Sequence, residues 1–256
     1  MAIAFSRKGS ASGFAMAAAA VVALSACATT AGMAERVEIE EETEAYDFQF
    51  AYPAAAAAIP ALKASLDAEA ATILANLEKE AAQAKADGFG GQYTWSMEYE
   101  TSADIPRFLS LSGAEATYLG GAHGNYGMTS LVWDREAGKG FSGLNLFELG
   151  ALERSDTRKK YCEGLNAERR KRRGFDVGPE DLFGDCPNFD MLATIVGSTN
   201  GSTFDTVTFH AAPYVAGGFA EGAYDVTLPV TPDMIAAVFP EYRASFSLAP
   251  LTPSRN

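Results

Sequence analysis

The sequence predicts an α+β fold in which antiparallel sheets, each covered by a helix, form two closely packed small domains. Between residues 93 and 99, large apolar side chains alternate with polar ones, which is typical of a half-buried strand. Residues 60–84 instead carry apolar side chains at helical spacing. Asn200-Gly201 between two apolar runs is a strong hairpin signal. Strands joined by hairpins, together with a long amphipathic helix, indicate this class.

The N-terminus resembles a lipoprotein signal peptide over residues 1–26. Two basic residues precede an apolar run at residues 14–24, which is too short to span a bilayer. A leucine and two small residues precede Cys27, as in the bacterial lipobox. We therefore expect export and a lipid on Cys27 that anchors the chain to a membrane, facing the periplasm. Ala28 in the next position favours the outer membrane if the cell has two membranes. The alternative is an ordinary signal peptide with an incidental cysteine.

The charge balance is strongly acidic. The chain has 20 basic and 33 acidic residues, a net charge of −13. Removing a signal peptide that contains two basic and no acidic residues leaves 18 against 33, or −15. Such a body repels nucleic acid and anionic headgroups, and it favours either cationic partners or simply solubility.

The segments up to residue 88 predict a tether, a strand and a helix. Residues 27–45 are rich in glutamate and contain little to bury, so we expect an acidic tether. Residues 46–52 alternate as a strand does, and Pro53 ends that strand. Pro60 suits the first turn of the following helix, and Gly88 ends it. We expect this helix to cover a sheet; a helix that binds a partner is the alternative.

A glycine-rich bend at residues 118–125 interrupts the strands in the middle of the chain. The alternation upstream changes phase near Gly113, which predicts a β-bulge there. Glycine supplies positive φ or close backbone approach, so His123 and Asn125 should occupy a sharp, partly exposed bend. The chain then returns as a strand over residues 128–134.

The segment from residue 151 to 187 combines a helix with a loop. Residues 151–173 favour helix and end in five consecutive basic residues. These cations either complement the helix dipole or dock an anionic partner. In an exported protein Cys162 and Cys186 should form a disulfide. Closing a loop of about 25 residues would stabilise the fold by about 3.5 kcal/mol on the chain-entropy model.

The C-terminal part reads as a small sheet with irregular connections. Strands are expected at residues 191–196, 204–209 and 224–230, and a short helix at 232–239. The loop after the second of these strands contains Pro213, Tyr214 and Gly217. Residues 241–256 should form an irregular tail.

These residues together resemble exported bacterial proteins that pair a DUF4163-like and a DUF3298-like domain. The first is also found as the noncatalytic N-terminal region of peptidoglycan deacetylases, the second as the extracellular end of lysozyme-sensing anti-sigma factors. The resemblance rests on Pro60-Ala61-Leu62, residues 118–125 as Y-T-G-G-A-H-x-N, Trp133-Asp134 with Gly138-Lys139 and Leu146-Phe147 as D-x-x-T-G-K…L-F, and Ala212-Pro213-Tyr214 with Gly217 as A-P-Y-x-x-G. Leu119 replaces the usual threonine.

The resemblance implies domains at residues 46–128 and 129–240, the second with a disulfide-pinned helical insertion at 151–187. It also implies an exported binding fold that recognises lysozyme or cell-wall material. The candidate binding residues are Tyr118, Gly120, Gly121, His123, Asn125, Pro213, Tyr214 and Gly217.

Three functions remain open at this point. A binding protein for lysozyme-like enzymes or peptidoglycan components is the first, a cell-wall hydrolase using His123 the second, and a structural envelope scaffold the third. The sequence contains no G-x-S-x-G or H-E-x-x-H motif, so we expect no catalytic residue, metal or cofactor. Asp134, Glu115 or Ser130 could neighbour His123 in space, although nothing in their spacing requires it. A structural histidine in the bend is the favoured interpretation.

Overall fold

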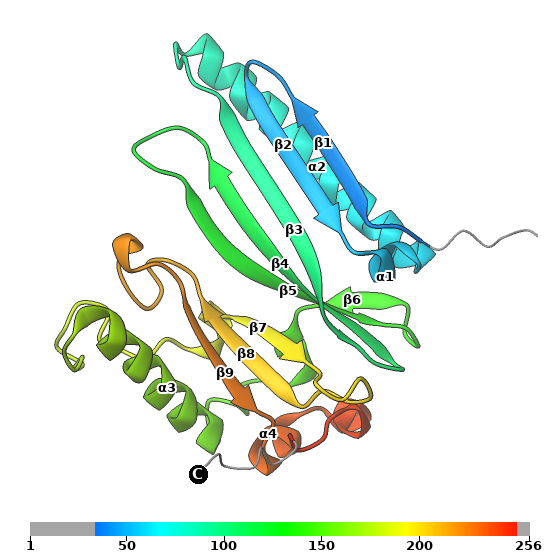
Figure 1. The fold of residues 1–256 in the computed structure, drawn as a ribbon, viewed down its shortest axis with the longest axis vertical. Helices are drawn as coiled ribbons and strands as arrows, with labels where there is room; N and C mark the ends of the chain where they lie inside the picture. Colours follow the sequence, from blue (N-terminus) through cyan, green and yellow to red (C-terminus); the bar gives the residue numbers. More distant parts are fainter. Residues whose placement is uncertain (1–33, 250–256) are drawn as a thin grey trace, which may run out of the picture. The chain divides into compact units, whose positions relative to one another are not determined.

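The computed structural model describes residues 34–249, and its larger sheet has the strand order β1-β2-β3-β4-β5-β6 (Figure 1). The strands are β1 (Val37–Glu42), β2 (Tyr46–Tyr52), β3 (Tyr93–Asp104), β4 (Phe108–Tyr118), β5 (Asn125–Asp134) and β6 (Lys139–Phe141). β2 and β3 pair in parallel and the other neighbours antiparallel. The parallel pair arises because the connection between them is a helical crossover rather than a hairpin.

That crossover consists of the short helix α1 (Ala54–Ala57) and the long helix α2 (Pro60–Ala86), which lies along one face of the sheet (Figure 1). Pro60 occupies the first turn, where its missing N–H costs nothing. One side of the helix buries Leu62, Leu66, Ala70, Leu77 and Ala81 against aromatic residues of β2 and β3. Each fully buried leucine contributes about 1.5–3 kcal/mol. The predicted helix covering a sheet is confirmed.

The predicted acidic tether is structured in part, because residues 37–42 form β1. Val37 and Ile39 pack against the core beneath α2, whereas Glu38, Glu40 and Glu42 are exposed. The sequence does not reveal this strand, because position 41 is also a glutamate and hides the alternation of apolar and polar residues. Pairing with β2 supplies the backbone hydrogen bonds that a lone charged segment lacks.

The prediction of a β-bulge at Gly113 is wrong. Gly113 pairs in regular register with Tyr99 and Thr129, and the irregularity lies between Thr101 and Ala103 of β3. A β-carbon on Gly113 would lie 2.7 Å from Tyr99 Cε1 and 2.8 Å from Thr129 Cγ2. Glycine is there to admit the tyrosine ring and not to bend the strand.

The smaller sheet has the order β7-β8-β9 and is covered by a second long helix (Figure 1). It comprises β7 (Ala193–Gly197), β8 (Thr206–Ala211) and β9 (Tyr224–Pro229), with α3 (Asp156–Arg173) beside β9 and α4 (Pro232–Ala237) following it. Short 3-10 turns occur at Gly143–Leu146, Phe189–Met191, Phe219–Glu221 and Pro240–Ser245. The α+β class with two helix-covered sheets is therefore confirmed.

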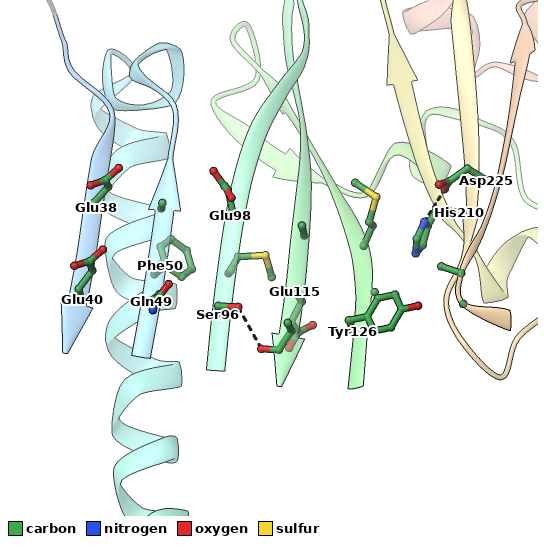
Figure 2. A pocket seen from close by; sticks show the side chains of 18 of the residues that line it. Glu38, Glu40, Gln49, Phe50, Ser96, Glu98, Glu115, Tyr126, His210 and Asp225 are labelled. Atoms are coloured by element: carbon green, nitrogen blue, oxygen red, sulfur yellow. Dashed lines mark hydrogen bonds and ion pairs between the residues drawn. The ribbon is translucent and has the colours of Figure 1, made fainter. Parts of the chain in front are cut away.

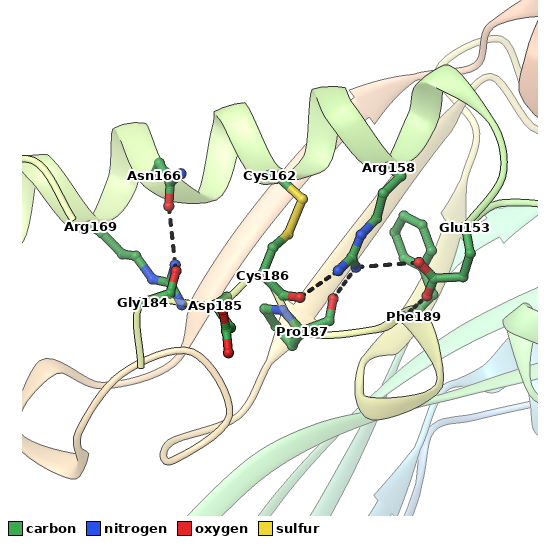
Figure 3. The surroundings of a disulfide bond; sticks show 10 residues. All are labelled: Glu153, Arg158, Cys162, Asn166, Arg169, Gly184, Asp185, Cys186, Pro187 and Phe189. Carbon is green, nitrogen blue, oxygen red and sulfur yellow. Dashed lines mark hydrogen bonds and ion pairs between the residues drawn. A yellow bond between two sulfur atoms is a disulfide. The ribbon is translucent and has the colours of Figure 1, made fainter. Parts of the chain in front are cut away.

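Helix α3 begins at Asp156, later than residue 151, because the Ser155 side chain accepts a hydrogen bond from Thr157 N and caps the helix. Gly174 ends the helix with a left-handed φ of 81°. The predicted disulfide between Cys162 and Cys186 is present and ties α3 to the following loop (Figure 3).

Three arginines at the C-terminal end of α3 bond to neighbouring segments of the fold. Arg169 is 0% exposed and donates hydrogen bonds to backbone oxygens of Gly184, Asp185 and Ala216. Arg172 donates to the backbone of the loop before β9, and Arg173 pairs with a glutamate in that loop. Four basic residues do lie in the last turn before Gly174, as the helix-dipole interpretation expects, and the bonds of these arginines to the fold are an additional role.

Two buried clusters share the strands of the larger sheet. Leu109 and Trp133 face α2 in the first core, whereas their neighbours Phe108 and Val132 belong to the second core around α3 and β7–β9. The expected division between residues 128 and 129 thus falls inside β5. Phe246 packs on Phe147 and Phe204, so the first residues of the predicted tail are ordered parts of the second core.

Candidate binding groove

An open groove of about 800 Å³ lies over the face of the larger sheet that α2 leaves free (Figure 2). Alternate residues of β1–β5 form its floor, and the polar face of β8 and β9 forms a wall. Ala114 and Ala116 are exposed on the floor, and their small side chains leave room above the sheet. We refer to this surface as the acidic groove.

The strand register arranges the floor in two rows that cross the sheet. One row runs through Glu38, Ala51, Glu98, Ala114 and Met128. The other runs through Glu40, Gln49, Ser96, Ala116 and Tyr126. Neighbouring strands are about 4.8 Å apart, so each row spans about 19 Å from β1 to β5. Carboxylates occupy β1 and β3, and an aromatic ring ends the second row.

The groove carries more negative than positive charge. Five carboxylates and two guanidinium groups line it, whereas the carboxylate of a further lining residue, Glu115, bonds Trp95 on the α2 side of the sheet. Arg36 donates to Glu98 at 2.6 Å and to Glu38 at 3.1 Å, whereas Glu40 has no hydrogen-bond or ion-pair partner among residues 34–249. The other guanidinium, Arg172, is held by the carbonyl oxygens of the loop before β9. The arrangement favours a cationic ligand.

A histidine–aspartate pair lies on the β8–β9 wall. His210 is 5% exposed, and its Nδ1 lies 2.7 Å from Asp225 Oδ1 (Figure 2). Its Nε2 has no partner among the described residues. Opposed positions on neighbouring strands bring the two residues together. No local sequence signal indicates this pair, because fifteen positions separate its members.

The glycine-rich bend closes the β4–β5 hairpin. Gly120 and Gly121 have φ of 85° and 97°, conformations that glycine adopts without strain, and Tyr118 Oη donates to Gly121 O at 3.1 Å. A β-carbon on Gly124 would lie 2.5 Å from a backbone oxygen. Asn125 opens β5 and is exposed. The expected sharp bend is present.

The second candidate loop connects β8 to β9 over residues 212–223. Pro213 and Gly217 are buried, whereas Tyr214 is 53% exposed. Tyr214 has a φ of 70°, and its N–H donates to Gly217 O at 2.9 Å. A β-carbon on Gly217 would lie 2.7 Å from the Tyr224 ring, so this position requires glycine.

The two loops meet in a cluster of rings that we call the aromatic shelf: His123, Tyr126, Tyr214 and Phe219. Phe219 stacks on His123 with ring centroids 4.0 Å apart and contacts Tyr214 and Tyr126 at 5.9 and 6.0 Å. Tyr214 Oη lies 3.4 Å from His123 Nε2. Sequence reasoning identified both loops but missed Phe219 and Tyr126, although both are aromatic residues a few positions from the chosen ones.

His123 lacks the neighbours that a hydrolase would need. Its Nδ1 lies 2.7 Å from Gly124 O. Asp134 is buried near the opposite end of β5 and pairs with Arg107. Ser130 accepts from the Gly143 N–H, and Glu115 accepts from Trp95 Nε1. All three candidate partners are therefore used elsewhere in the fold.

A charged network fixes the loop that carries the shelf. Glu221 accepts from Arg173, from Tyr224 Oη at 2.6 Å and from the Gly218 N–H. Burial raises the pKa of Glu221, but these three donors outweigh that effect and lower its pKa to about 2. Arg169 Nε holds the same loop through Ala216 O at 2.9 Å. The rings are thus presented by an ordered loop.

Among residues 34–249, no three histidine, cysteine or acidic side chains are grouped as a metal site would require. Within the same span, no helix combines the length and apolar character needed to cross a bilayer. The lipobox and Cys27 lie outside the described residues.

Comparison with known proteins gives one family match and two structural likenesses. Residues 39–126 match the family model described as Deacetylase PdaC. The fold is similar to that of a DUF3298 family protein from Pseudomonas aeruginosa PAO1, with a TM-score of 0.51 and 15% identity over 81% of this chain and 94% of that chain. A DUF3298 family member from Bacteroides fragilis NCTC 9343 gives a TM-score of 0.48 and 17% identity over 80% and 92%.

The curated proteins contain no match to this sequence. The N-terminal part of the chain thus matches the PdaC model, and most of the chain has a fold similar to that of a DUF3298 protein, in agreement with the resemblance of its motifs. At 15% identity the structural likeness concerns the fold alone. The shelf is built from the end of the PdaC-type region and the β8–β9 loop beyond it.

Proposed function

We propose that the chain is a binding protein of the cell envelope whose acidic groove receives the basic surface of a partner protein of the lysozyme type. Anchoring through a lipid on Cys27 would hold it at the membrane, facing the periplasm. The observation that carries the proposal is the excess of carboxylates on the groove floor, where Glu38, Glu40 and Glu98 accompany a single guanidinium group, that of Arg36. Complementary charge accelerates encounter and fixes the register of binding.

The rigidity of the floor supports this function. Glu38, Glu40 and Glu98 project from paired strands, so little conformational freedom of the backbone is lost when a ligand binds. A cell-wall hydrolase using His123 has less support, because no carboxylate contacts that ring among the described residues. A purely structural scaffold does not account for an open groove with an unpaired glutamate.

Binding of the purified full chain to lysozyme at two salt concentrations tests the groove. The Debye length falls from about 30 Å at 0.01 M to about 3 Å at 1 M salt, so we expect micromolar binding at the lower and none at the higher concentration. The variant Glu40→Gln/Glu98→Gln should bind about fivefold more weakly at low salt, since exposed pairs contribute about 0.2–1 kcal/mol each.

The matched control is Glu80→Gln/Glu180→Gln, which removes two exposed carboxylates outside the groove. It changes the net charge equally and should bind as the unmodified chain does. Absence of binding at 0.01 M salt, or equal weakening by both variants, would reject the groove as the site.

The lipid anchor has a separate test. Replacing Cys27 with alanine should move the chain from the membrane fraction to the soluble fraction of cells, because the acylated residue is gone. An unchanged membrane fraction would reject anchoring at this cysteine and leave the groove experiment unaffected.

A further inference from the structure

We propose that the aromatic shelf stacks the guanidinium group of an arginine, so that the site selects arginine-bearing partners over lysine-bearing partners of equal charge. The inference rests on the proposed function, because it assigns a subsite to the same ligand. Three rings from two loops and the Tyr126 ring from the start of β5 form the shelf, and Tyr126 belongs both to the shelf and to the groove floor.

The rings of the shelf remain accessible. Tyr126 is 41% and Tyr214 53% exposed, and both contact the central Phe219. Adjacent exposed aromatic rings on one surface mark an interaction site more often than isolated ones do. The shelf thus offers ring faces without unfolding of either loop.

The backbone of Tyr214 is held in a conformation that disfavours a tyrosine. Its φ of 70° lies in the left-handed region, where a bulky residue is an outlier. The ring is not buried in return, so packing does not offset the strain. Strain that displays an exposed ring, in a loop fixed by Arg169 and Glu221, points to a ligand for that ring.

The chemistry around the shelf favours a guanidinium group. Tyr126 shares the groove with Asp225 on the wall, and Glu98 lies two strands, or about 10 Å, from β5. A planar guanidinium stacks flat on a ring while its N–H groups still donate sideways to carboxylates. An ammonium group is a strongly hydrated point charge and lacks this geometry.

Other ligands with flat faces fit less well. Nucleic acid carries phosphates that the groove repels. A neutral sugar can stack on the rings but leaves the excess of carboxylates without a counter-charge. An extended segment of about six residues spans the 19 Å row, so its arginine can reach Tyr126 while other cations meet Glu98 and Glu40.

The chain already uses the same contact internally. The Arg172 guanidinium lies 3.9 Å from the centroid of Tyr224, and that of Arg107 lies 5.0 Å from those of Phe108 and Tyr242. Arg172 also faces the groove, where backbone oxygens hold it in place. The Tyr126 hydroxyl lies near Arg172, because a β-carbon on Gly222 would be 3.1 Å from Tyr126 Oη and 3.8 Å from Arg172 Nη1, so an incoming guanidinium must stack on the part of the shelf that lies away from this hydroxyl.

The test compares two peptides that differ only in carrying arginine or lysine at the same positions, titrated into the full chain by calorimetry. We expect the arginine peptide to bind about tenfold more tightly, from cation–π energies of partly desolvated sites. Tyr126→Leu keeps apolar area but removes the ring, and it should reduce the affinity for the arginine peptide to about that for the lysine peptide.

The matched control is Phe175→Leu, which removes a 55% exposed ring outside the shelf and should keep the preference. Tyr214→Asn provides a second shelf variant whose side chain tolerates the left-handed backbone. It should also reduce the preference, so that misfolding of one variant leaves the other informative.

Equal affinity for the two peptides in the unmodified chain would overturn the inference but leave the proposed groove function intact. Binding of lysozyme without binding of either peptide would have the same meaning. Failure of both peptides and of lysozyme would reject the groove function and the inference with it. A chito-oligosaccharide that binds and is lost in Tyr126→Leu, with no arginine preference, would assign the shelf to glycans instead.

Discussion

Replacing Arg169 with lysine should destabilise the protein far more than its conservative chemistry suggests. The side chain is 0% exposed and has four acceptors, which are three backbone oxygens and Asn166 Oδ1, but no carboxylate. Burial, and then the nearby charge of Arg173, lower its pKa from the usual value. The fold thus keeps a buried cation with only neutral partners (Figure 3).

The magnitude follows from the acceptors that a lysine leaves unpaired. The four bonds diverge from three nitrogens of the planar guanidinium, and an ammonium group cannot span them. At least two acceptors then lose their donor at about 1–3 kcal/mol each, giving a loss of about 4 kcal/mol. For a chain of this size the melting temperature should fall by about 8–16 °C.

Urea denaturation of the full chain, followed by circular dichroism, measures this loss. Arg170→Lys is the matched control, because Arg170 is the exposed neighbour of Arg169 and forms a surface ion pair with Asp176. This variant should change the unfolding free energy by less than about 0.5 kcal/mol. If Arg169→Lys costs no more than Arg170→Lys, the buried guanidinium does not hold the two loops together as described.

Three further predictions concern pH, packing and oxidation. Because the folded-state pKa of Glu221 is depressed, its stabilisation is full above pH about 4.5 and is lost as the pH falls towards about 2, so Glu221→Gln should flatten the stability curve in this window. Gly113→Ala should cost about 1–3 kcal/mol by overpacking at three contacts of 2.7–2.8 Å, whereas Gly90→Ala, with open space around it, should not destabilise. Replacing Cys162 and Cys186 with serine should lower the unfolding free energy by about 3.5 kcal/mol.

Each of these has a contrary result. If the unfolding free energy of Glu221→Gln fell as steeply at acid pH as that of the unmodified chain, other carboxylates, such as Asp134, would control the acid transition. A stable Gly113→Ala would mean that Tyr99 relaxes freely, although its hydroxyl hydrogen bonds to Glu69. An unchanged unfolding free energy without the disulfide would mean that the loop is held by its other contacts.

Local sequence signals were enough to locate the helices and strands whose apolar residues follow one clear periodicity. Pro60 and the helical spacing located α2, and alternation from Tyr93 to Tyr99 located the first half of β3. β1 was missed because Glu41 fills an inward position, where its carboxylate accepts a hydrogen bond from the Tyr46 hydroxyl. Gly113 was misread because a glycine that admits a ring and a glycine that shifts register look identical in a sequence.

The candidate site shows the same limit. The loops of His123 and Tyr214 were recognised from their motifs, and the structure brings them into contact. The carboxylate rows depend on the parallel pairing of β2 with β3, which joins residues about 47 positions apart. Such non-local register has no local sequence signal, so the groove itself was not predicted.

The sharing of β4 and β5 by two cores has a consequence for how the chain is made. Phe108 and Val132 belong to the same buried cluster as Phe246, which is synthesised more than a hundred residues after both of them. Until then the nascent sheet exposes apolar side chains on the face that the second core will cover. The larger sheet is therefore complete on both faces only after the last residues of the second core have been synthesised.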